Sequence, residues 1–191
     1  MQIELIVSVF TAVFLAELGD KTQITVACIA ARGGSVFKVF FCSLAGLAAI
    51  TVINLIIGAG LRYLIPIYIV KVASAILFIV LGVFSILKRE DREKSEECKS
   101  AEGIYALLLV ALMEFGDKTQ LAVVSLSAST GKYLEVFTGA ILAFALSCLI
   151  ASLIGGSLRK ITKYERAIKV ASGIVFIIIG VVMLIEALGF I

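Results

Sequence analysis

The sequence predicts an all-α integral membrane protein with six transmembrane helices, built as two three-helix repeats of inverted topology. The first reason is composition: of 191 residues, 61% are hydrophobic, the mean hydropathy is +1.14, and there is one proline. Soluble domains are about half apolar, and a membrane-spanning helix needs about 20 mainly apolar residues. Six such runs with short loops use nearly the whole chain, which leaves no room for a soluble catalytic domain.

The second reason is an internal repeat. Residues 17–23 read ELGDKTQ (the first motif) and return at 114–120 as EFGDKTQ (the second motif), changed at one position. At the same offset of 97 residues, 58–62 (GAGLR) recur as 155–159 (GGSLR). Polar residues and glycines matching at a fixed spacing are hard to reach by chance in apolar helices. We therefore infer a duplication within the chain.

The duplication divides the chain into three predicted segments. A first repeat covers residues 1–87, a charged cytoplasmic linker covers 88–102, and a second repeat covers 103–191. The linker mixes five basic with six acidic side chains, which is typical of a solvated connection. The six predicted spans lie at about 6–31, 36–61, 66–87, 103–127, 133–158 and 167–188.

The number of spans per repeat sets the predicted topology. Three is odd, so the second repeat must enter the membrane from the opposite side, as in many secondary transporters. With the N-terminus outside, twelve Lys and Arg residues fall in cytoplasmic segments and three outside, the two motif lysines excluded. Positive charge concentrates on the cytoplasmic side of membrane proteins. Both termini are therefore predicted to lie outside the cytoplasm.

Each motif places charged side chains inside an apolar run, where they are costly and usually mark a substrate or ion pathway. Residues three and four apart share one face of a helix, so the Glu, Asp and Lys of each motif should cluster. If the pseudo-twofold joins the motifs, four carboxylates and two ammonium groups meet near the middle of the bilayer. These residues are Glu17, Asp20 and Lys21 in the first motif and Glu114, Asp117 and Lys118 in the second.

The neutral motif residues complete the predicted site. Thr22 and Gln23, with Thr119 and Gln120, supply further oxygen atoms beside the carboxylates. The motif glycine weakens the helix at the point where backbone carbonyls could turn toward an ion. Asn54 is a lone polar residue in the second span, and the sequence leaves open whether it joins two helices or supports the site.

The ligand chemistry favours a hard cation. The chain has no histidine, and its four cysteines are scattered and outside the motifs, which argues against a zinc site or a disulfide framework. Oxygen ligands alone favour calcium, manganese or magnesium over copper or zinc. Clustered carboxylates repel one another, so some hold protons in the empty site and release them to a divalent cation. Such competition is the minimum requirement for exchange.

The paired motifs resemble those of the GDT family of cation/proton exchangers, whose signature is Glu-x-Gly-Asp-Lys/Arg-Thr/Ser. The resemblance covers nearly the whole chain and places it in the lysine-exporter superfamily. It implies export of manganese or calcium from the cytoplasm, driven by proton antiport across the plasma membrane. It also implies that the metal-binding carboxylates are Glu17, Asp20, Glu114 and Asp117.

The motifs are also compatible with other functions. An exporter of small cationic metabolites could hold an amine against the same carboxylates, and a passive cation channel would ignore a proton gradient. A structural protein could use the motifs as salt bridges between helices. We expect no enzyme activity, no cofactor and no nucleic-acid partner; the partners are divalent cations, protons and the lipid bilayer, with a homodimer left open.

Overall fold

The computed structural model describes residues 2–18, 20, 23, 26–27, 36–87, 117–154 and 165–189. The regular structure of this part of the chain is entirely α-helical, which confirms the predicted all-helical class. The linker at 88–102 and most of the predicted fourth span lie outside the described residues. The helices are α1 (Gln2–Glu17), α3 (Val36–Leu64), α4 (Ile67–Leu87), α6 (Lys118–Thr130), α7 (Tyr133–Ile154) and α8 (Glu165–Ala187).

Four of these helices, α3, α4, α7 and α8, are long and apolar enough to cross a membrane. Their outer faces carry large apolar side chains: Phe37 is 74% exposed on α3, and Leu134 is 79% exposed on α7. An apolar surface of this extent would drive association in water. It suits contact with lipid, so the described fold is that of a membrane protein.

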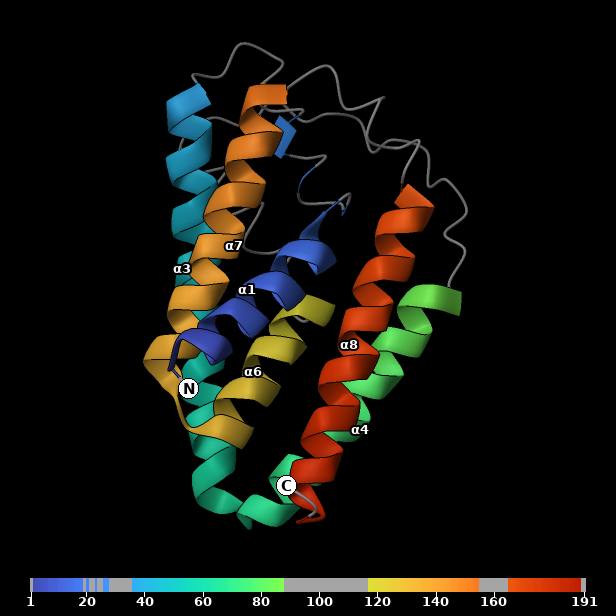
Figure 1. The fold of residues 1–191 in the computed structure, drawn as a ribbon. Helices are drawn as coiled ribbons and strands as arrows, with labels where there is room; N and C mark the ends of the chain where they lie inside the picture. Colours follow the sequence, from blue (N-terminus) through green and yellow to red (C-terminus); the bar gives the residue numbers. More distant parts are fainter. Residues whose placement is uncertain are drawn as a thin grey trace.

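The two shorter helices lie between two pairs of long ones. In Figure 1, α3 and α7 stand on one side, α4 and α8 on the other, and α1 and α6 run between them. The contacts agree, since α1 packs on α7 and α8 while α6 packs on α3 and α4. The middle of the bundle is therefore formed by the helices that end or begin at the two motifs.

Glycine lets α4 and α8 approach closely. A Cβ on Gly82 would lie 2.6 Å from the Gly173 carbonyl oxygen, and a Cβ on Gly180 would lie 2.8 Å from the Ala75 carbonyl oxygen. Residue numbers rise along α4 as they fall along α8, so the helices are antiparallel, as Figure 1 shows. Small residues at such crossings allow close backbone packing in membrane helices.

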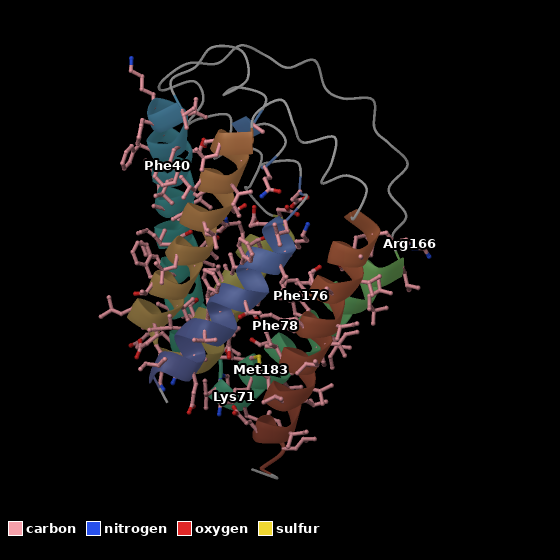
Figure 2. All side chains as sticks on the ribbon, turned by 45° about the horizontal axis from the view of Figure 1, so that its top comes forward. Phe40, Lys71, Phe78, Arg166, Phe176 and Met183 are labelled. Atoms are coloured by element: carbon pink, nitrogen blue, oxygen red, sulfur yellow. The ribbon has the colours of Figure 1, made fainter. Side chains whose placement is uncertain are left out.

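An aromatic pair lies between the two glycine contacts. Phe78 and Phe176 meet edge to face, with ring centroids 5.5 Å apart, and are labelled in Figure 2. Phe176 stands 98 residues after Phe78 in the sequence. The same shift carries Gly82 to Gly180, and Ala75 to Gly173. Each residue of one glycine contact thus has its counterpart, 98 positions away, in the other contact. The packing of α4 on α8 is therefore symmetric with respect to the repeat.

The predicted bounds of the long helices agree with the structure to within a few residues. Pro66 directly precedes α4, and its carbonyl oxygen accepts a hydrogen bond from the Ile69 amide at 2.9 Å. The α4 helix ends at Leu87, as expected, and α7 begins at Tyr133. These boundaries follow from a proline or a turn at each helix start.

One prediction about the first span is wrong. The helix that contains Glu17 ends there, Leu18 lies in a turn, and Asp20 is not helical. The Asp20 amide donates to the Glu17 carbonyl at 3.1 Å, which closes a turn tighter than that of an α-helix. Residue 19 is glycine, which is about 1 kcal/mol less favourable than alanine inside a helix. Glu17 and Asp20 are therefore brought together by a helix end rather than by a continuous helical face.

Candidate ion-binding site

The second motif marks the beginning of a helix. Asp117 is the N-cap of α6, with extended backbone angles, and its Oδ1 accepts a hydrogen bond from the Lys118 amide at 2.7 Å. An aspartate at this position satisfies a free backbone N–H and suits the positive end of the helix dipole. The first motif contains the end of α1 and the second contains the start of α6, so each motif coincides with a helix end.

Two contacts join the motifs across the bundle. The Lys118 ammonium lies 2.8 Å from Asp20 Oδ2, and the Thr119 hydroxyl donates to Glu17 Oε1 at 2.7 Å. In both cases the donor comes from the second motif and the carboxylate from the first. The expectation that the two motifs meet thus holds for these four residues.

The joined groups lie at different depths. Glu17 is 1% exposed, whereas the side chains of Asp20 and Lys118 are 12% and 28% exposed. The Asp117 carboxylate lies beside Asp20, and Glu17 is near enough to Lys118 to interact with its charge. One ammonium group thus contacts Asp20 and lies within electrostatic reach of Asp117 and Glu17, so the described part of the site has more carboxylates than cationic groups.

The three carboxylates do not converge on a single point. Among the described residues, no three His, Cys, Asp or Glu side chains are placed to hold one metal ion. The Thr119 hydroxyl, the Lys118 ammonium and the α6 terminus each engage a separate carboxylate. Glu114, Lys21 and Thr22 belong to the predicted site and lie outside the described residues.

The two motif glutamines are buried and bonded to the long helices. Gln23 Nε2 donates to the Ser147 hydroxyl of α7 at 3.4 Å. Gln120 Oε1 accepts a short hydrogen bond from Asn54 Nδ2 of α3. Asn54, which the sequence left undecided, is therefore bonded to a motif residue. Ser147 was not predicted, because a serine in an apolar helix is usually a small packing residue.

Comparison with known proteins identifies the family. The family model described as "Divalent cation/proton antiporter GDT1" matches residues 5–93 and 103–189. No solved structure matches the chain.

Three relatives are similar over most of this chain. "Protein PAM71, chloroplastic" of Arabidopsis thaliana is 29% identical over 94% of this chain and 56% of its own length. "GDT1-like protein 1, chloroplastic" of Oryza sativa subsp. indica is 29% identical over 94% of this chain and 61% of its own length. "GDT1-like protein sll0615" of Synechocystis sp. is 28% identical over 88% of this chain and 90% of its own length. The chain thus spans little more than half of the first two.

These matches confirm the resemblance that the motifs indicated, and the family is one of transporters. Its model covers both motifs and the helices that carry them. The chain belongs to the divalent cation/proton antiporter GDT1 family.

Proposed function

We propose that the chain exports manganese, or alternatively calcium, from the cytoplasm in exchange for protons across the plasma membrane. The observation that carries the proposal is the pair of contacts between the motifs, Lys118 to Asp20 and Thr119 to Glu17, at a helix interruption inside an apolar bundle. Charged groups in such a place usually mark an ion pathway, and interrupted helices form the substrate sites of many secondary transporters.

The ion would be bound by carboxylates that, in the described structure, contact the Lys118 ammonium, the Thr119 hydroxyl and the Lys118 amide. Glu17, Asp20 and Asp117 supply the described oxygen ligands, with Glu114 as the fourth predicted ligand. Lys118 neutralises Asp20 in the described arrangement, so an arriving divalent cation must take over that carboxylate from the ammonium group. Oxygen ligands without histidine or thiolate favour manganese and calcium.

Proton exchange follows from the shortage of neutralising charge. One ammonium group serves three described carboxylates, and like charges this close in a site of low dielectric oppose full ionisation. Protons relieve the repulsion when the cation has left, and the next cation displaces them. The same carboxylates thus carry the cation in one direction and protons in the other.

We further propose that the chain forms six spans in two repeats of inverted topology, which rock about the motifs to give alternating access. The antiparallel, exchangeable contacts between α4 and α8 support this arrangement. So does the match of the family model to 5–93 and 103–189. The interrupted helices α1 and α6 would then present the site to either side in turn.

The test is uptake into proteoliposomes. Manganese and calcium uptake are each measured with and without an imposed proton gradient, using wild type and Asp117→Asn. Asparagine caps a helix about as well as aspartate, so this variant keeps the start of α6 and removes one ionisable ligand. We expect gradient-dependent uptake in wild type and its loss in the variant.

Other outcomes would identify a different activity. Equal cation uptake with and without the proton gradient would contradict cation/proton exchange and indicate a passive channel. Wild-type behaviour in a correctly inserted Asp117→Asn protein would refute the site.

The ion pair itself favours one second candidate. Asp20 accepts an ammonium group from Lys118, so the site is compatible with the amine of a small cationic metabolite. Competition decides between the two substrates. Excess metabolite should leave manganese uptake unchanged if the metal is the substrate.

A further inference from the structure

Asn54 is a buried amide side chain in the apolar helix α3. It is 8% exposed, and a buried amide is costly unless it is hydrogen-bonded. Its partner is Gln120, which belongs to the second motif and to the other half of the chain. The Asn54–Gln120 bond therefore ties a helix of the first half directly to the candidate site.

The Gln120 carboxamide is bonded at one end only. The side chain is 2% exposed, its Oε1 accepts from Asn54, and its Nε2 has no hydrogen-bond partner in the described structure. Gln120 immediately follows Thr119, which bonds Glu17, and its backbone amide donates to the Asp117 carbonyl oxygen at 3.0 Å. An unsatisfied, buried amide on a motif residue is a position that a ligand can complete.

An amide pair can reverse without losing its hydrogen bond. If both carboxamides turn over, Gln120 Nε2 donates to Asn54 Oδ1, and Gln120 Oε1 takes the unpartnered place. A carbonyl oxygen there is a ligand that manganese and calcium accept, whereas an amide N–H₂ would repel them. We propose that Asn54 is a positioning residue that holds Gln120 while its carbonyl oxygen binds the transported cation. This inference rests on the proposed function and adds a residue to its site.

The two halves are not equivalent in this respect. The position 97 residues after Asn54 is Ala151, and Gln23 instead reaches Ser147 over 3.4 Å. A serine hydroxyl offers one donor in place of the Asn54 carboxamide, and 3.4 Å is long for a hydrogen bond. The proposed ligand position therefore belongs to the second motif, and Ser147 provides a matched control.

The experiment is a double-mutant cycle of Asn54→Leu and Gln120→Leu. The readouts are the KM and kcat for manganese uptake, and the Kd for radioactive ⁵⁴Mn²⁺ binding to the purified protein. Loss of a residue that orients a metal ligand lowers affinity by about 10–100-fold. We expect each single variant to raise KM and Kd in that range, with little change in kcat, and the double variant to match Gln120→Leu.

Two further variants sharpen the cycle. Aspartate can accept from Gln120 Nε2, so Asn54→Asp should not raise the Kd by more than about threefold, since the orienting bond is retained and the added negative charge attracts a cation. Ser147→Ala should also change the Kd by less than about threefold, because it removes only a long, weak contact.

Additive effects of Asn54→Leu and Gln120→Leu would overturn the inference, as would an unchanged Kd in Asn54→Leu. If Asn54→Leu does not fold, a tenfold or greater rise in Kd for folded Asn54→Asp would overturn it too. Wild-type protein that binds manganese without gradient-dependent transport would refute the proposed function, and the Kd values would still decide the role of Asn54. Absence of manganese binding by wild type would refute both.

Discussion

Glu17 shows how a single side chain can keep a carboxylate inside the bundle. It is 1% exposed, and its Oε1 accepts from the Thr119 hydroxyl at 2.7 Å. A buried charge without a partner would be far more costly than this hydrogen-bonded one. Threonine donates a hydrogen bond without adding charge. It therefore stabilises Glu17 without taking the place of a bound cation as a lysine would.

The Thr119–Glu17 bond can be tested by an isosteric substitution. Thr119→Val removes the hydroxyl and keeps the shape, so we expect the free energy of unfolding to fall by about 1.5–3 kcal/mol, the range for hydrogen bonds to charged groups. Thr119→Ser keeps the donor and should lie close to wild type. Denaturant unfolding in detergent measures both. Equal losses in the two variants would contradict this role of the hydroxyl, because Thr119→Ser retains the donor and Thr119→Val does not.

At the residue scale, the sequence indicated the motif residues more clearly than the residues that contact them. The carboxylates were predicted as a site because charge in an apolar run is rare, and two of them, Asp20 and Glu17, contact residues of the other motif. Asn54 and Ser147 could not be assigned as partners of the motifs from the sequence. A single amide or hydroxyl in an apolar helix gives the same sequence pattern whether it bonds a motif residue or another helix. Which oxygen each donor selects depends on the packing of helices far apart in sequence.

Among the helices, α6 is defined at both ends by specific contacts. Asp117 caps its N-terminus, and Gly131 ends it in the left-handed conformation, with φ of 68° and its amide bonded to the Ser127 carbonyl. Arg62 Nη1 of α3 donates to the carbonyl oxygens of Ala128 and Ser129, at 3.1 and 3.0 Å. The cation satisfies the last carbonyls of the helix and opposes the negative end of its dipole.

The end of α6 gives a second stability prediction. Gly131→Ala places a Cβ 2.8 Å from the Arg62 guanidinium carbon, and left-handed backbone costs a non-glycine residue about 1–2 kcal/mol. We expect a loss of at least that size in the free energy of unfolding. The control is Gly60→Ala, whose Cβ meets nothing within 4 Å; it should stabilise the helix by about 0.5–1 kcal/mol. Destabilisation of Gly60→Ala by as much as Gly131→Ala would contradict this account.

Helix boundaries were predictable where a proline or a turn sequence precedes the helix. Pro66 before α4 and the turn before α7 are visible in the sequence, and the observed helices begin there. The end of α1 at Glu17 was not foreseen, because the apolar run continues beyond the motif to about residue 31. Hydropathy detects the length of a span and is insensitive to an interruption inside it.

For the molecule as a whole, the described helices place their ends consistently with the proposed topology. In Figure 1, α1 begins and α8 ends toward the same, lower end of the bundle. The proposed topology, which rests on the distribution of positive charge in the sequence, has that end outside the cytoplasm. The start of α1 and the end of α8 thus lie on the same side of the bundle, as the proposed topology requires.

Cysteine labelling in intact cells tests the orientation. In a background without the four native cysteines, we introduce Glu4→Cys, Glu186→Cys or Arg92→Cys, the first two at exposed positions. A membrane-impermeant maleimide should label the variants at 4 and 186, and should label the variant at 92 only after the cells are opened. The reverse pattern would place the termini in the cytoplasm.

The close contact between α4 and α8 also has a consequence for how such a chain could arise. Because Gly82–Gly173 and Ala75–Gly180 exchange under a shift of 98 residues, a single ancestral repeat could have made the same contact with a second copy of itself. In that ancestor every substitution would have altered both sides of the contact at once. Gene fusion would have freed the two sides to drift apart. Position 75 is alanine whereas its counterpart, position 173, is glycine, and this is the kind of difference that such drift leaves.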